Sequence, residues 1–247
     1  MRIPRIYQAV PLKLEETISL DSQATTHVVR VLGLKLDDRI IIFNGEGGEY
    51  AGVLVQADKR AVLVKLVEYR DPQNESPLHT VLLQGVSRGE RMDYALQKSV
   101  ELGVSEIYPV MTKYTSVQLK DDRKQKKQMH WQGVVQSACE QSGRNRVPVV
   151  HAVDSLGSWL DNFVFEDYDL CLVLNHRTSQ SITKMEKPKQ PKVVLIAGPE
   201  GGLSEEEIAF LESKKFVSVN LGPRVLRTET AALAAISIMQ SMWGDFN

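Results

Sequence analysis

Two glycine-containing segments in the last quarter of the chain carry residue types suited to close contact with a ligand. The first, "AGPEGGLS" at 197–204, follows the apolar run "KVVLI", and the second, "LGPRVLRTETA" at 221–231, follows "VSVNL". Glycine lets a ligand approach the backbone because it has no side chain. Ligands of open α/β sheets bind where the strands end at their carboxyl side. We therefore expect the two segments to form neighbouring walls of one binding site.

The same segments exclude the common phosphate-binding motifs. A P-loop needs the pattern G-x-x-x-x-G-K-[ST], whereas the 198–204 loop has no lysine and precedes the carboxylates of Glu205, Glu206 and Glu207. Neighbouring carboxylates would repel a phosphate. The dinucleotide fingerprint G-x-G-x-x-G is missing from the whole chain. The loops therefore predict a ligand that is read by backbone groups and carries no phosphate.

Part of this acidic run has a structural explanation. Ser204 with Glu207 three residues later forms the pattern of a capping box, in which each side chain bonds the backbone N–H of the other residue. We favour this reading over a catalytic role for residues 205–207. Glu200 lies outside the expected helix and is the better functional candidate.

The chain upstream of these loops divides into two patterns. Residues 1–72 are β-rich, with a short helix after Asp21 or Ser22 and strands at 39–43, 50–56 and 61–69. A polar linker at 70–77 follows. From residue 78, strands alternate with helices, which indicates a mostly parallel sheet with helices on both faces. The strands are predicted at 79–86, 106–111, 169–174, 192–197 and 217–221, and the helices at 91–102, 129–142, 204–215 and 229–242.

Composition limits the remaining possibilities. The chain has 247 residues and a net charge of −1, but the 113–146 segment holds eight Lys or Arg against three Asp or Glu, which can attract phosphate groups. Its first part, "DDRKQKKQ", reads equally well as a solvated helix start. The longest apolar stretch is far shorter than a membrane span of roughly 20 residues, and no leader-like segment opens the sequence, so we expect a cytoplasmic protein. Two isolated cysteines and five scattered histidines predict no metal site.

Four ordered motifs carry a family resemblance. "QKSVELGV", "CEQSGRNRVP", "IAGPEGGLSEEE" and "LGPRVLRTETA" together resemble the RsmE family, the SPOUT-class methyltransferases that methylate N3 of a uridine in 16S ribosomal RNA. The resemblance implies a PUA-like RNA-binding domain at 1–72. It also implies a SPOUT domain at 73–247 that ends in a deep trefoil knot and forms a homodimer through its knotted face.

The resemblance further implies S-adenosylmethionine as cofactor and 16S ribosomal RNA as partner. The cofactor would contact three segments: Leu174, Asn175, Gly198, Pro199, Glu200, Gly201, Gly202, Leu221, Gly222, Pro223, Val225, Leu226, Arg227 and Thr228. Arginines are suited to clamp phosphates. The RNA contacts would include Arg2, Arg5, Arg88, Arg91, Arg144 and Arg146.

The proposed reaction must remove the proton on uracil N3, so a base or a donor to the developing negative charge is expected. We favour Arg227 as the group that stabilises charge on a uracil oxygen, with Glu229 and Glu200 as candidate bases. Glu140 with Arg144 in "CEQSGRNR" is a further candidate pair. Glu229 could instead simply favour the dipole of the last helix. No covalent intermediate is required, so Cys139 is expected in the core.

Two rival functions are weighed against this one. A nucleotide-dependent or dehydrogenase-like enzyme is disfavoured because both nucleotide fingerprints are absent. A non-catalytic RNA-binding module would have no need for the second Gly/Pro turn in "LGPRVLRTETA" with a leucine on either side. Binding of S-adenosylmethionine distinguishes the methyltransferase from both.

Overall fold

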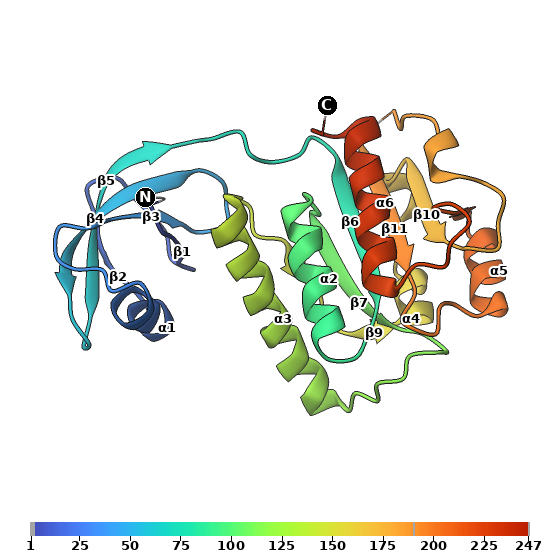
Figure 1. Cartoon of the computed structure of the whole chain (residues 1–247), viewed down its shortest axis with the longest axis horizontal. Coiled ribbons are helices and arrows are strands. Elements are labelled where there is room, and N and C mark those ends of the chain that lie inside the picture. The colour runs from blue at the N-terminus through green and yellow to red at the C-terminus, as the bar shows by residue number, and fades with distance from the viewer. Residues whose placement is uncertain (1–2, 190, 247) are drawn as a thin grey trace. The chain divides into compact units, whose positions relative to one another are not determined.

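The computed structural model describes residues 3–189 and 191–246, without the side chain of Asp121. These residues form two compact units (Figure 1). The first comprises the chain up to residue 75 together with 136–147, and the second comprises 76–135 together with 148–246. The boundary expected at 72/73 differs from this division mainly because 136–147 belongs to the first unit. Arg2 lies outside the described residues.

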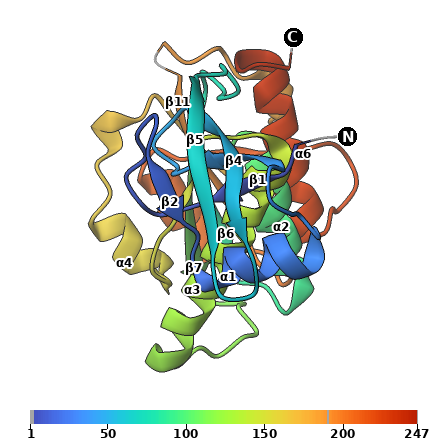
Figure 2. The same ribbon diagram turned by 90° about the vertical axis from the view of Figure 1, so that its left-hand side faces the viewer.

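The first unit is built on a five-stranded sheet with the order β1-β3-β4-β5-β2, and Figure 2 shows its long β4 and β5 strands. Its strands are β1 (Arg5–Tyr7), β2 (Thr17–Ser19), β3 (Arg39–Phe43), β4 (Glu49–Ala57) and β5 (Val62–Arg70). The expected helix start is confirmed, because the Asp21 side chain accepts from Ala24 N–H at the beginning of α1 (Ser22–Thr26), which continues into η1 (His27–Val31). The unit is β-rich, as predicted.

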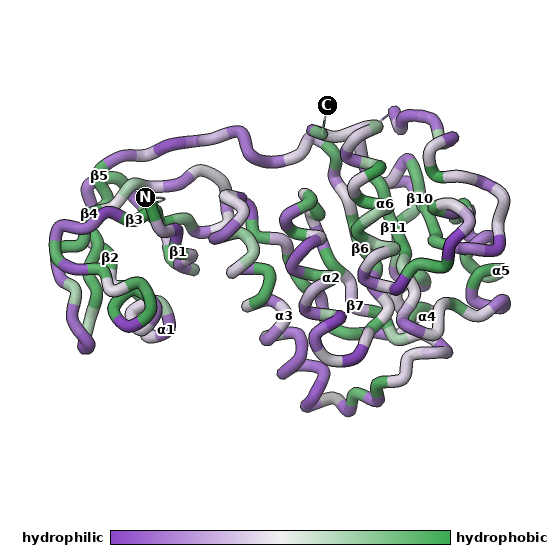
Figure 3. The backbone as a smooth tube through the Cα atoms, viewed as in Figure 1, coloured by the Kyte–Doolittle hydropathy of each residue, from purple (hydrophilic) through white to green (hydrophobic). Residues whose placement is uncertain are grey.

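The second unit contains a seven-stranded parallel sheet, with the main order β12-β10-β11-β6-β7-β8 and β9 paired to β7. Parallel pairing of strands separated by helices confirms the predicted α/β class. The strands are β6 (His79–Gly85), β7 (Glu106–Met111), β8 (Val149–Val150), β9 (Asp154–Ser155), β10 (Leu170–Leu174), β11 (Lys192–Ala197) and β12 (Val217–Val219). β6, β10 and β11 are mostly buried and apolar (Figure 3), as expected for strands covered on both faces.

Helices cover this sheet. On one face of the sheet, alternate strand residues such as Val81 and Val194 form a core cluster with Leu160 and Leu211. The residues between them on each strand point to the opposite face, where two further helices, α2 and α6, pack together. The helical elements are α2 (Glu90–Glu101), α3 (Asp121–Ser142), α4 (Leu156–Asp161), η2 (Phe165–Asp167), η3 (Ile182–Lys184), α5 (Glu205–Ser213) and α6 (Thr228–Trp243). The first turns of α3 are hydrophilic in Figure 3, so "DDRKQKKQ" is a solvated helix start. No helix among the described residues is long and apolar enough to span a membrane.

Strand register aligns the ends that carry the two glycine segments. Ala197 at the end of β11 pairs with Gln84 of β6, and Leu174 at the end of β10 pairs with Val219 of β12. The loops after β10, β11 and β12 therefore begin at the same edge of the sheet. The last helix, α6, contacts both β11 and η3 in the β10–β11 connection, which is compatible with the knotted connection that the family resemblance implies.

Candidate cofactor site

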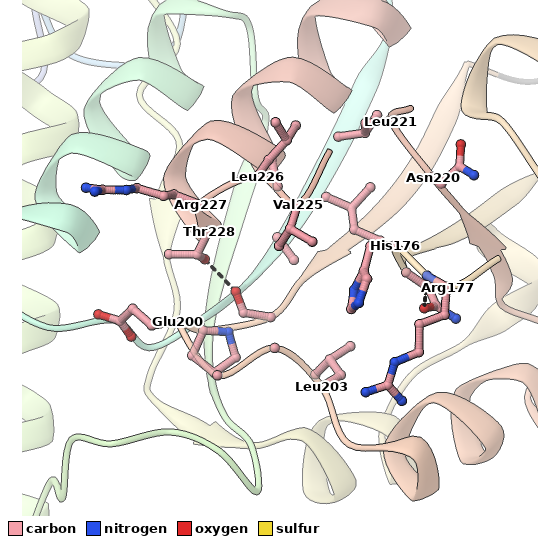
Figure 4. Close-up of a pocket in the computed structure, with 18 of the residues that line it drawn as sticks. His176, Arg177, Glu200, Leu203, Asn220, Leu221, Val225, Leu226, Arg227 and Thr228 are labelled. Atoms are coloured by element: carbon pink, nitrogen blue, oxygen red, sulfur yellow. Dashed lines mark hydrogen bonds between the residues drawn. The ribbon is translucent and has the colours of Figure 1, made fainter. Parts of the chain in front are cut away.

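A cavity of about 420 Å³ opens at this edge, entirely within the second unit (Figure 4). The sequence predicted most of its walls. Its lining includes Arg91, Leu174, Asn175, Gly198, Pro199, Glu200, Gly201, Gly202, Leu221, Gly222, Val225, Leu226, Arg227, Thr228 and Glu229. Pro223 belongs to the same segment but does not line the cavity. The two glycine segments thus form walls of one cavity, as expected from their positions after neighbouring strands.

The first wall, 198–202, has a backbone that side chains would disturb. A Cβ atom at Gly198 would lie 2.9 Å from the carbonyl carbon of Gly202, and Gly202 itself has a φ of +71°. Gly85 at the end of β6 would place a Cβ atom 2.4 Å from the nitrogen of Pro199. Glycine at these positions lets the loop fold tightly against the sheet and present its backbone to the cavity.

Thr228 joins this wall to the last helix. Its hydroxyl donates to the carbonyl oxygen of Gly198 and accepts from the side-chain amide of Gln84 at 3.0 Å. Thr228 and Gln84 are both buried. Three segments far apart in the sequence are therefore connected by one hydroxyl, and the 198–202 loop is fixed to the start of α6.

The capping box predicted at Ser204 is present. Glu207 N–H donates to Ser204 Oγ at 3.2 Å, and Ser204 N–H donates to Glu207 Oε2 at 2.8 Å. The other carboxylate oxygen, Oε1, accepts from Lys113 N–H at 2.7 Å. Glu207 thus has a structural role, and it also holds the segment that follows β7.

Glu200 lies at the edge of the cavity beside two arginines. Its Oε1 accepts from Arg88 N–H at 2.9 Å and lies 3.4 Å from the Arg91 guanidinium. Partial burial opposes ionisation of Glu200, but the hydrogen bond from Arg88 and the charge of Arg91 outweigh it and lower the pKa of this carboxyl. A carboxylate with a lowered pKa is a weak base, so this geometry favours an anchoring role.

Arg227 lies at the N-cap of α6, and Glu229 lies in its first turn. Arg227 is exposed at the N-cap position, and its guanidinium has no hydrogen bond or ion pair within the described part of the chain. Glu229 Oε2 is buried without a partner among the same residues. Figure 4 places Arg227 and Glu200 on one side of the cavity and His176 and Arg177 on the other. An unpaired cation and an unpaired buried carboxylate oxygen are groups that a substrate could engage.

Several lining residues escaped the sequence analysis: Tyr114, His176, Arg177, Asn220 and Arg224. Two of them could have been found, because His176 and Arg177 follow β10 directly, as the glycine loops follow β11 and β12. Arg177 is held by Glu205, the first residue of α5, at 2.5 Å. Tyr114 comes from the loop after β7, which carries no glycine pattern.

The predicted RNA-binding arginines fall into two groups. In the first unit, Arg5 is paired with Glu49, and the buried Arg144 donates to Glu75 at 2.7 Å. These contacts favour structural roles for Arg5 and Arg144, unlike the exposed Arg146 in the same unit. In the second unit, Arg88 and Arg91 are exposed. RNA contact stays a prediction for the exposed arginines.

Both cysteines are buried, and burial raises the pKa of the Cys139 and Cys171 thiols to about 12. They stay protonated and unreactive at neutral pH. Neither lines the cavity. Among the residues that the structure describes, no group of three or more His, Cys, Asp or Glu is arranged to hold a metal ion.

Comparison with known proteins gives the class first. Residues 74–240 match the RNA methyltransferase domain, and residues 20–67 match the RNA methyltransferase PUA domain. A methyltransferase from Legionella pneumophila, solved with bound SAM, superposes with a TM-score of 0.94 at 36% identity over 100% of both chains. The fold is therefore that of an RNA methyltransferase with a PUA domain.

The particular family follows from full-length relatives. The ribosomal RNA small subunit methyltransferase E of Buchnera aphidicola from Schizaphis graminum is 34% identical over 100% of this chain and 99% of its own. That of Bacillus subtilis is 32% identical over 90% and 88%. The Neisseria gonorrhoeae enzyme, solved with S-adenosyl methionine, has a TM-score of 0.92 at 37% identity over 100% of both chains. This chain belongs to the RsmE family.

Proposed function

We propose that this protein transfers the methyl group of S-adenosylmethionine to N3 of a uridine in 16S ribosomal RNA. One observation carries the proposal: a chain of the RsmE family has a cavity walled by glycine loops at the carboxyl ends of its parallel strands. The RsmE protein of Neisseria gonorrhoeae was solved bound to S-adenosyl methionine. We place the reaction in the cytoplasm, where small subunits are assembled.

The cavity fits this cofactor chemically. Its volume of about 420 Å³ lies in the usual range for small-molecule sites. The backbone of 198–202 can bond an adenine or ribose edge, and the side chains of Leu221 and Leu226 can contact the apolar faces of the ring. When bound, the cofactor would supply an electrophilic methyl group for transfer to uracil N3.

The residues of the chain manage the charge that develops on uracil. When the N3 proton passes to a base, negative charge develops on N3 and the uracil oxygens, and this charge would be neutralised as N3 takes the methyl group. Arg227 stabilises this charge. Its guanidinium has no hydrogen bond or ion pair among the described residues, so none has to be broken when it binds a uracil oxygen. Glu229, with a buried and unpartnered carboxylate oxygen, is the better placed base, and Glu200 holds Arg88 and Arg91.

The experiment has two readouts. Calorimetric titration with S-adenosylmethionine tests the cavity, and methylation of small subunits and of free 16S ribosomal RNA, followed by nucleoside mass spectrometry, identifies the product. We expect cofactor binding and 3-methyluridine in at least one substrate. Lack of binding, or methylation at another uracil atom, contradicts the proposal.

We also propose that the protein forms a homodimer through α6. This helix has a buried side, but apolar Leu233 and Ile238 on its other positions are only half-buried within one chain. A second copy would cover them. Light scattering coupled to size-exclusion chromatography should give twice the mass of one chain, and a monomer for Leu233→Glu with retained circular dichroism. A monomeric wild type contradicts this part of the proposal.

A further inference from the structure

Tyr114 lies at the mouth of the cavity and belongs to neither glycine segment. It lines the cavity, yet 47% of the residue is exposed to solvent. Its loop connects β7 with α3, and nothing in the cofactor chemistry described above uses an aromatic ring there. The proposed cofactor contacts therefore do not explain why an exposed tyrosine lies at the mouth of the cavity.

The loop that carries Tyr114 is fixed on both sides. Thr112 N–H donates to Thr115 Oγ1 at 2.9 Å, and Thr115 N–H donates to the carbonyl oxygen of Thr112 at 3.1 Å, which closes a turn around Tyr114. Lys113 N–H donates to Glu207, as described above. The ring is therefore presented from a rigid turn, and little conformational entropy is lost when something packs on it.

The cofactor loop also leaves room for this side chain. A Cβ atom at Gly201 would lie only 2.7 Å from Cβ of Tyr114. Because Gly201 has no side chain, the tyrosine packs directly against the wall of the cavity. The aromatic ring and the wall that is proposed to hold the methyl donor are thus built against each other.

One cationic side chain lies near the ring, and another lines the cavity. Lys113 Nζ lies 5.8 Å from the ring centroid, and Arg91 lines the same cavity. The ion pair of Lys113 with Glu206 joins two exposed side chains, whereas Arg91 pairs with the partly buried side chain of Glu200. An exposed ion pair contributes little free energy, so Lys113 can exchange its carboxylate for a phosphate at small cost. An exposed aromatic ring beside an exchangeable cation is the combination that binds single-stranded RNA, by base stacking and phosphate contact.

We propose that Tyr114 is a stacking platform for a nucleobase of the RNA segment around the target uridine. The inference rests on the proposed function, because it assigns an RNA contact to the same cavity. A half-exposed tyrosine alone would carry no such meaning. Tyr94 on α2 illustrates this: it is 49% exposed and has Lys98 Nζ 5.9 Å from its ring, but it does not line the cavity.

Tyr94 provides the matched control for the test. Tyr114→Ala, Tyr114→Phe and Tyr94→Ala are compared with wild type by fluorescence anisotropy with a labelled hexauridylate, and by the KM for small subunits in methylation. We expect Tyr114→Ala to weaken RNA binding and raise the KM about tenfold, as loss of one stacked base does. Tyr114→Phe and Tyr94→Ala should match wild type in RNA binding, in KM and in affinity for S-adenosylmethionine.

The outcomes separate the two proposals. If wild type methylates RNA and Tyr114→Ala behaves as Tyr94→Ala does, stacking is refuted and the proposed function stands. If wild type binds hexauridylate through Tyr114 but neither binds S-adenosylmethionine nor methylates, the function is refuted and stacking stands. An equal loss in Tyr114→Ala and Tyr114→Phe also overturns the inference, because a phenyl ring stacks as a phenol does.

Discussion

The two ends of the parallel sheet in the second unit both gather polar side chains, and the cavity described above opens at the carboxyl end. At the amino end, His79 begins β6, Glu106 begins β7 and His151 follows β8. Glu106 accepts from His79 at 3.3 Å and from His151 at 3.0 Å, and the His151 ring stacks on Tyr108 with centroids 3.8 Å apart. These groups satisfy one another.

At the carboxyl end the polar groups are left available. Arg227 has no partner among the described residues, Glu229 has a buried oxygen without a hydrogen bond, and glycine loops leave backbone exposed to the cavity. The difference shows that a cluster of titratable residues is not by itself a functional site. Unsatisfied groups beside an open volume indicate a ligand, whereas satisfied groups in contact indicate stability.

The largest expected effect tests the carboxyl end directly. Arg227→Ala should lower kcat for methylation by about 100-fold, because a donor to the developing charge is lost. Calorimetry should show unchanged affinity for S-adenosylmethionine. Arg227→Lys should recover part of the rate, since it keeps the charge but not the planar fork. Full activity in Arg227→Ala would remove this residue from the mechanism.

The second-largest effect is expected for Thr228, whose hydroxyl joins the 198–202 loop to the start of α6. Thr228→Val removes the hydroxyl that bonds Gly198 and Gln84, so the Gly198 carbonyl loses this donor and the buried Gln84 amide keeps only its bond to the Gly85 carbonyl. We expect the free energy of unfolding to fall by about 2 kcal/mol and the affinity for S-adenosylmethionine to fall about tenfold. Thr228→Ser keeps the hydroxyl and serves as control. If Thr228→Val and Thr228→Ser have the same free energy of unfolding and the same affinity for S-adenosylmethionine, the Thr228 hydrogen bonds contribute to neither.

The amino end should affect stability alone. Hydrogen bonds from His151 and His79 lower the pKa of Glu106 below its unfolded value of about 4.3, although partial burial opposes this shift. A lowered folded pKa stabilises the protein above the unfolded pKa, and this contribution is lost as the pH falls through the folded pKa.

Glu106→Gln should therefore be less stable than wild type by about 1 kcal/mol at pH 7, and the difference should shrink as the pH falls below 4. Urea denaturation across that range measures it. Methylation at pH 7 should be unchanged at temperatures where the variant is folded. A stability difference that grows in acid would contradict the assigned direction of the pKa shift.

The smallest effect is expected for Glu200→Gln. The amide oxygen still accepts from Arg88 N–H, and only the charge attraction to the half-exposed Arg91 side chain is lost. The rate of methylation should fall by less than about fivefold. The acid limb of the pH–rate profile should stay in place, since Glu200 is not the base. A loss as large as that of Arg227→Ala would restore Glu200 as a catalytic group.

Much of the second unit follows from local sequence patterns. Apolar runs separated by amphipathic helices predicted its parallel strands, and the capping box at Ser204 was predicted with both hydrogen bonds. The cavity walls were found because Gly and Pro follow strands directly, and strand ends fix where loops begin. These features depend on neighbours in the chain, which a sequence displays.

Long-range contacts could not be predicted in the same way. Glu75 is 69 residues from Arg144 in the sequence, and no local pattern predicts that the two side chains form an ion pair. The sequence therefore predicted an RNA contact for Arg144 but not its ion pair with Glu75, which joins two parts of the first unit. Tyr114 was missed for the same reason, because its meaning depends on Gly201 across the fold.

The tie through Thr228 has a kinetic consequence for cofactor exchange. Since 198–202 is joined to α6, that wall cannot swing open without breaking buried hydrogen bonds. Residues 223–226 differ: among the described residues they make no backbone hydrogen bond, and Val225 is 76% exposed. We expect this segment to be the gate. Residence time of the spent cofactor, and with it turnover, would then be set by a hinge motion between Asn220 and Arg227 that leaves the sheet intact.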